Sequence, residues 1–114
     1  MQGGACKSLT KNTTFLFVVM RGIQWNTKSA FVFLGDALDY YDSWPVPTVI
    51  ISDGPYGVGR YPGDPRTPER LPELYRPHLE AWTRLATPMT TLWFWNTELG
   101  WAVMHKTIEP FGWE

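Results

Sequence analysis

The stretch Thr48–Gly59, TVIISDGPYGVG, joins an apolar run to an acid, a glycine, a proline and a tyrosine, with further glycines after them. β-Branched and apolar residues without polar alternation are typical of a strand buried on both faces of a parallel sheet. The run ends at Ser52, and Asp53 follows directly. The stretch therefore predicts a buried strand, Thr48–Ser52, that presents a carboxylate and an aromatic ring on a stiff turn at its carboxyl end.

A second apolar run, Ala30–Leu34, lies upstream and is also followed by a glycine and an acid, Gly35 and Asp36. Continuous runs of this kind suit strands that are covered on both faces. We therefore expect Ala30–Leu34 to lie beside the Thr48–Ser52 strand in one parallel sheet. Because ligands gather at the carboxyl ends of parallel strands, Asp36 and Asp53 are expected on the same rim of that sheet.

The carboxyl-terminal half alternates between helical and strand patterns. Apolar side chains recur at helical spacing over residues 73–86, and Pro77 limits where a regular helix can begin. A strand is expected within residues 89–95, and Asn96 or Thr97 can cap a further helix. The order strand, strand, helix, strand, helix predicts an α/β fold with three or more parallel strands joined by crossover helices. The inward stripe of the last helix is expected to be Trp101, Met104, Ile108 and Phe111.

The proline-rich segment at residues 59–72 predicts a long loop, and long loops in small domains commonly carry function as lids or binding loops. Arginines in and after this segment could contact phosphates, but acids interleave with them, which favours a solvated charged face. The arginines are Arg60, Arg66, Arg70, Arg76 and Arg84, and the acids are Asp64, Glu69, Glu73 and Glu80.

Composition weakens or excludes several classes of protein. The 114 residues carry a formal net charge of −1, so no basic field indicates nucleic-acid binding. Cys6 is the single cysteine, which rules out an internal disulfide and a cysteine-rich zinc cluster. His78 and His105 stand singly at helical positions, so no metal is predicted. The seven tryptophans are expected mainly in the core.

Residues 1–28 fit no motif and are interpreted as a poorly specified leader. Their apolar run, Phe15–Met20, is too short to span a bilayer and has no small-residue cleavage site after it. We therefore expect no membrane partner. The single cysteine is consistent with a reducing setting, so the expected location of the protein is cytoplasmic.

The segment Gly35–Gly59, GDALDYYDSWPVPTVIISDGPYGVG, resembles the amino-terminal part of the amino-group DNA methyltransferases of the permuted β class. In that family a GDAL segment leads to a strand that ends in Asp-Pro-Pro-Tyr. The resemblance implies that residues 29–114 form the amino-terminal part of a Rossmann-like methyltransferase catalytic domain. It also implies methyl transfer from S-adenosyl-L-methionine to the exocyclic amine of a flipped base, and an acid at position 53 points to adenine N6.

The resemblance assigns a role to each residue of the turn. The Asp53 carboxylate and the Gly54 backbone carbonyl, fixed by Pro55, would accept hydrogen bonds from the base amine and localise its lone pair. Tyr56 would offer a face on which the flipped base stacks. Asp36, in the matching Gly-Asp segment, would lie at the adenine edge of the cofactor. The alternative for Asp53–Tyr56 is an ordinary strand-end turn, and the alternative for Asp36 is a helix cap.

Two departures from the family matter. Gly54 stands where the family has its first proline, which loosens the peptide that presents the carbonyl. The family's Phe-x-Gly-x-Gly cofactor segment and its target-recognition region are both absent from the 114 residues. We therefore expect a fragment with half of an active site, inactive alone, that binds S-adenosyl-L-methionine weakly or not at all. DNA and a separate cofactor-binding half are its expected partners in the complete enzyme.

A second hypothesis is a non-catalytic α/β remnant that binds a partner or a nucleobase and transfers nothing. Both hypotheses account for the apolar strands and for the turn residues. They differ in whether a segment carrying Phe-x-Gly-x-Gly accompanies this chain.

Overall fold

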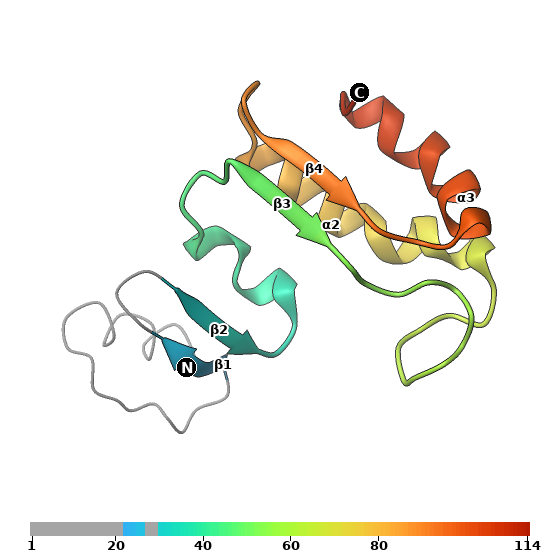
Figure 1. Cartoon of the computed structure of the whole chain (residues 1–114), viewed down its shortest axis with the longest axis horizontal. Coiled ribbons are helices and arrows are strands. Elements are labelled where there is room, and N and C mark those ends of the chain that lie inside the picture. The colour runs from blue at the N-terminus through green and yellow to red at the C-terminus, as the bar shows by residue number, and fades with distance from the viewer. Residues whose placement is uncertain (1–21, 27–29) are drawn as a thin grey trace. The chain divides into compact units, whose positions relative to one another are not determined.

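The structure, a computed structural model, describes residues 22–26 and 30–114. The chain divides into two compact units, Met1–Asp39 and Tyr40–Glu114, whose elements are labelled in Figure 1. Helices and strands both occur, so the fold is mixed α and β. The cysteine and the apolar run at residues 15–20 lie outside the described residues. Within the described part, no helix has both the length and the apolar character needed to cross a bilayer.

The first unit contains an antiparallel strand pair, β1 (Gly22–Asn26) and β2 (Phe31–Leu34). The expectation that the Ala30–Leu34 run pairs with the Thr48–Ser52 strand is wrong, because β2 pairs with a strand from the segment interpreted as a leader. An antiparallel neighbour that is close in sequence closes a shorter loop than a parallel neighbour needs. Most side chains of β2 are exposed, so this strand is not covered on both faces.

The second unit contains a parallel strand pair and two α-helices. In chain order these are β3 (Val49–Ser52), α2 (Leu71–Leu85), β4 (Thr91–Phe94) and α3 (Glu98–Ile108). Short 3-10 helices lie at Tyr41–Ser43, Pro68–Arg70 and Glu109–Phe111. The predictions of strand, helix, strand and helix in this part of the chain are confirmed, and the first helix begins two residues earlier than the sequence predicts.

Strands β3 and β4 pair in parallel, with Val49 opposite Thr91 and Ser52 opposite Phe94. The described residues contain one parallel sheet, and it has two strands. The expected three or more parallel strands are therefore not present in that part of the chain. The α/β character itself is confirmed, because α2 connects two parallel strands as a crossover helix does.

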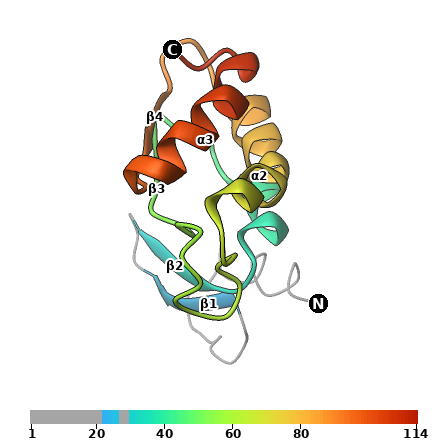
Figure 2. The same ribbon diagram turned by 90° about the vertical axis from the view of Figure 1, so that its right-hand side faces the viewer.

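One face of this sheet is covered, and the other is open. Ile50 of β3 is buried and Phe94 of β4 packs against the same core as helices α2 and α3, which lie side by side in Figure 2. On the opposite face Val49, Ile51 and Trp93 are 48%, 68% and 57% exposed. The expectation that β3 is buried on both faces is therefore wrong for this unit, because its side chains alternate between core and solvent.

Helix α2 supplies most of the core. Its buried side chains Leu71, Tyr75, Leu79 and Trp82 recur every three or four residues and so form one stripe. Pro77 lies inside the helix at an exposed position, so the helix continues through it and loses one backbone hydrogen bond. The inference that Pro77 limits the start of the helix is therefore wrong.

Helix α3 is capped at its start by one of the two residues that the sequence indicates. The Thr97 hydroxyl accepts a hydrogen bond from the Gly100 N–H at 3.0 Å, which confirms Thr97 as its cap. Met104 and Ile108 are buried as expected. Trp101, the first residue of the expected inward stripe, is instead exposed.

The tryptophan side chains are more exposed than the sequence predicts. Trp82 lies in the core, whereas Trp44, Trp93, Trp95 and Trp101 are exposed. The prediction that the tryptophans lie mainly in the core is therefore wrong for these four. Of these four, Trp93 belongs to the sheet, whereas Trp44 follows a 3-10 helix and Trp101 lies on α3.

We expect Leu79→Ala to lower the free energy of unfolding by about 2 to 5 kcal/mol, because it removes a fully buried side chain and leaves a cavity. Urea unfolding followed by circular dichroism measures this change. Leu99→Ala is the matched control: Leu99 is 70% exposed on α3, and its loss should change the free energy by no more than about 0.5 kcal/mol. Equal losses from both variants would contradict the core described above.

Candidate functional site

Asp53 lies at the carboxyl end of β3 with its side chain exposed. The Tyr56 hydroxyl donates a hydrogen bond to Asp53 Oδ1 across the turn. This hydrogen bond is the main reason that the pKa of Tyr56 lies above its ordinary value, and burial adds to the effect. The carboxylate and the ring that the sequence singled out are thus brought together, and the carboxylate keeps Oδ2 as a further acceptor.

The carbonyl of Pro55 fixes the turn to the rest of the unit. It accepts hydrogen bonds from the Tyr75 hydroxyl of α2 and from Asn96 Nδ2, each at 3.1 Å. Burial raises the pKa of Tyr75 well above its ordinary value, and a hydrogen bond with Ser52 acts in the opposite direction. Tyr75 therefore keeps its proton and remains a donor at neutral pH.

The Tyr75 hydroxyl also explains why residue 54 is glycine. A Cβ atom at Gly54 would overlap Tyr75 Oη and lie 3.3 Å from Tyr75 Cζ. The proline that the resemblance leads one to expect carries such a Cβ atom, so it does not fit beside Tyr75 in this arrangement. Glycine in place of proline at position 54 makes the turn more flexible, and the two hydrogen bonds to the Pro55 carbonyl restrain it.

The Asp64 carboxylate holds the backbone of residues 56–60 in a closed loop. It accepts hydrogen bonds from the backbone N–H groups of Tyr56 and Gly57 at Oδ1, and from those of Val58 and Arg60 at Oδ2. The side chain is only 7% exposed. Burial raises the pKa of the Asp64 carboxyl, but the backbone hydrogen bonds outweigh it, so the pKa lies below its ordinary value.

Sequence reasoning missed three residues of this site. Asp64 was interpreted as one acid of a solvated charged face, but it is buried and bonded to the backbone. Tyr75 falls within the helical pattern of residues 73–86, which gives its hydroxyl no role, and Asn96 is one of two candidate helix caps. The polar tip of a tyrosine on a buried helix face is the signal that could have indicated a hydrogen bond inside the unit.

Asp36 has a local role in the first unit. Its Oδ1 accepts a hydrogen bond from the Leu38 N–H at 3.0 Å, and the 3-10 helix Ala37–Asp39 follows directly. This is the capping geometry that was the alternative to a cofactor contact. Because Asp36 follows β2 and Asp53 follows β3, and these strands belong to different sheets, the expectation of one shared rim is wrong.

The two histidines contact aromatic rings. His78 Nδ1 and the Tyr41 hydroxyl form a hydrogen bond of 2.8 Å, and His105 lies against the ring of Trp101. Among residues 22–26 and 30–114, no three histidine, cysteine, aspartate or glutamate side chains lie close enough together to hold a metal ion.

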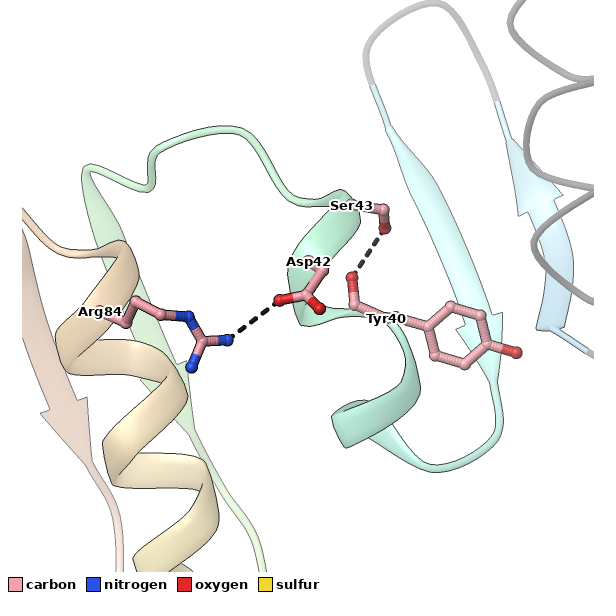
Figure 3. A network of polar contacts seen from close by, with 4 residues as sticks. All are labelled: Tyr40, Asp42, Ser43 and Arg84. Atoms are coloured by element: carbon pink, nitrogen blue, oxygen red, sulfur yellow. Dashed lines mark hydrogen bonds and ion pairs between the residues drawn. The ribbon is translucent and has the colours of Figure 1, made fainter.

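The arginines near the proline-rich loop fall into two groups. Arg84 pairs with Asp42 at 3.0 Å, as Figure 3 shows, and Arg70 pairs with Glu73 at 3.1 Å. Next to the first pair, the Ser43 hydroxyl donates to the Tyr40 carbonyl. The second group, Arg60, Arg66 and Arg76, makes no ion pair with the described residues.

A groove of about 960 Å³ lies elsewhere on the second unit. It is lined by the end of α2, by β4 and by α3 with the residues after it, including Thr83, Leu92, His105 and Trp113. None of the four turn residues lines it. This groove and the candidate chemistry are therefore at different places on this unit.

Comparisons of the chain with models of known protein families, with curated protein sequences and with solved structures find no match.

We expect Gly54→Ala to destabilise the protein by about 1 to 3 kcal/mol, because the added methyl group overlaps the Tyr75 hydroxyl. In a Tyr75→Phe background the hydroxyl is gone, and most of this loss should disappear. Urea unfolding of the four proteins in this double-mutant cycle measures the coupling, which should be at least about 1 kcal/mol. Additive effects would mean that Tyr75 does not dictate glycine at position 54.

A pH dependence follows from Asp64. We expect Asp64→Asn to lower Tm at pH 7, because an amide nitrogen cannot accept the N–H groups that a carboxylate oxygen accepts. The folded pKa lies below the unfolded value of about 3.9, so the stabilisation is present above that value and is lost as the pH falls through the folded pKa.

The difference in Tm between wild type and Asp64→Asn should therefore shrink below about pH 4. Differential scanning calorimetry from pH 7 to pH 3 measures it. Asp42→Asn, which alters an exposed carboxylate, is the control and should show no comparable trend. A difference that stays constant with pH would exclude the charged Asp64 carboxylate as its cause.

Proposed function

We propose that this chain carries the base-binding part of an amino-group DNA methyltransferase that methylates adenine at N6. The observation that carries the proposal is the turn Asp53–Tyr56, where an exposed carboxylate and an aromatic ring are held together at the end of a parallel strand. Ligand sites of α/β proteins gather at this end of a sheet. The proposed fold is correspondingly part of a Rossmann-like methyltransferase domain.

The chemistry needs two acceptors at one place. An exocyclic amine is a weak nucleophile because its lone pair is delocalised into the base. Acceptors on its two hydrogens localise the pair and aim it at the methyl donor. Asp53 Oδ2 can be one acceptor, since the Tyr56 hydroxyl bonds to Oδ1. The Gly54 carbonyl can be the other, because no described residue donates a hydrogen bond to it.

Preorganisation supports a catalytic use of this turn. Three side chains from other parts of the unit, Tyr75, Asn96 and Asp64, bond to its backbone at Pro55 and Tyr56. Polar groups that are fixed before the reaction need no reorganisation as charge develops, and that is the main source of electrostatic catalysis. An ordinary strand-end turn does not require this many supports.

S-Adenosyl-L-methionine would supply the electrophilic methyl group when bound. Asp36 is the one residue that the resemblance assigns to it, and one oxygen of that carboxylate already accepts the Leu38 N–H. We therefore propose that a separate polypeptide segment provides most of the cofactor site. The open sheet face with Val49, Ile51 and Trp93 supports this, because parallel sheets are normally covered on both faces.

The second candidate is a non-catalytic α/β module that binds a partner through the same open sheet face. The Tyr56–Asp53 hydrogen bond also fits this candidate, since it satisfies one oxygen of the carboxylate within the chain. The capping role of Asp36 favours it as well. The two candidates differ in whether Asp53 is needed for methyl transfer.

The test restores the cofactor half by co-expressing the chain with the Phe-x-Gly-x-Gly half of a permuted β-class adenine methyltransferase. N6-methyladenine in the DNA is measured by mass spectrometry. Asp53→Ala should lower the rate at least about 100-fold, because one preorganised acceptor is lost. It should leave cofactor affinity nearly unchanged, because the carboxylate acts on the base.

Asp42→Ala is the matched control, since it also removes an exposed carboxylate from the same unit. It should keep the parental rate. Methylation by Asp53→Ala at the parental rate would remove the methyltransferase proposal and leave the partner-binding module.

A further inference from the structure

We propose that residues 57–66 form a nucleic-acid contact loop, in which Arg60 and Arg66 bind phosphates of a DNA strand and Tyr61 stacks on a base. The inference deepens the proposed function, on which its biological role depends, because the loop follows the Asp53–Tyr56 turn directly. Phosphate contacts fix the position of a strand, and stacking holds a base that has left the helix.

The loop is closed by its own hydrogen bonds. The Gly59 N–H donates to the Pro65 carbonyl at 2.9 Å, and the Asp64 N–H donates to the Tyr61 carbonyl at 3.0 Å. Gly57 and Gly59 have φ angles of 76° and 67°, which residues with side chains rarely adopt. A loop that is shaped before binding loses less conformational entropy when a ligand arrives.

The charge of the loop is unbalanced at its surface. Asp64 is its acid, and the Asp64 carboxylate is buried and bonded to backbone N–H groups. Arg60 and Arg66 are exposed and make no ion pair with the described residues, unlike Arg70 and Arg84. The interleaved acids that favoured a solvated face therefore do not neutralise these two guanidinium groups, which suit phosphate.

Tyr61 and Arg66 of the loop are positioned where they can contact a DNA strand. Tyr61 is 50% exposed, and its phenol lies within electrostatic reach of Asp64 and Asp53, whose charges raise the pKa of Tyr61 after the larger effect of burial. The stem of Arg66 passes over Gly59, where an added Cβ would lie 3.3 Å from Arg66 Cγ. Along the chain Tyr61 follows Arg60 and precedes Arg66. An aromatic ring combined with cationic residues is the set that binds single strands without reading their sequence.

The test uses the full chain and a fluorescently labelled single-stranded DNA of about 20 nucleotides, with anisotropy measured from about 50 to 200 mM salt. The double variant Arg60→Gln/Arg66→Gln should reduce the salt slope by about 1.4, because each phosphate contact on a single strand contributes about 0.7. Arg70→Gln/Arg84→Gln changes the net charge equally and is the matched control, for which wild-type binding is expected.

Stacking is tested at Tyr61. Tyr61→Ala should weaken binding about 5- to 150-fold, and Tyr61→Phe should restore it, because the ring face and not the hydroxyl is used. Circular dichroism checks that every variant is folded, which is expected for exposed side chains. Equal losses in the two arginine pairs, no loss with Tyr61→Ala, or no binding by the wild type at about 50 mM salt would overturn the proposal.

The outcomes separate this inference from the proposed function. If DNA binding depends on the loop but methylation is unchanged by Asp53→Ala, the loop proposal stands and the methyltransferase proposal fails. If methylation requires Asp53 but is affected equally by the two double arginine variants, the methyltransferase proposal stands and the loop proposal fails.

Discussion

The hydrogen bond from the Tyr75 hydroxyl to the Pro55 carbonyl connects the core of the second unit to its candidate site. The Tyr75 ring is 3% exposed and packs with Leu79 and Phe94, so the position of its hydroxyl is set by the core. That position decides where Pro55 lies, and it excludes any side chain at residue 54. The glycine that departs from the family's motif is thus a consequence of how α2 packs on the sheet.

The Asp64 carboxylate has a comparable role in the next segment. Backbone N–H groups that converge on one point form a site for an anion, and here the chain supplies its own. This use of Asp64 has two consequences. The turn that carries Tyr56 is held from both sides, and the Asp64 carboxylate is taken up by backbone N–H groups and does not pair with Arg60 or Arg66. One buried side chain therefore shapes the loop and also leaves its surface positively charged.

Much of the second unit could be predicted from the sequence. The apolar run at Val49–Ser52, the helical stripe of α2 and the Thr97 cap depend on neighbouring residues, so pattern and propensity are sufficient to identify them. Strand partners and exposure could not be predicted in this way. Continuous apolar runs look alike whether one face or both are covered, and β2 pairs with a strand in a segment that had no recognisable pattern.

That an acid, a flexible residue, a proline and a tyrosine follow an apolar strand can be read directly from the chain, because Asp53–Tyr56 are consecutive. The contacts that hold these four residues in place come from the folding of the unit. Tyr75 and Asn96 are 20 and 41 residues from Pro55, and Asp64 is eight residues from Tyr56. Contacts between such distant positions leave no periodic signal, because they depend on how α2, β4 and the loop pack together.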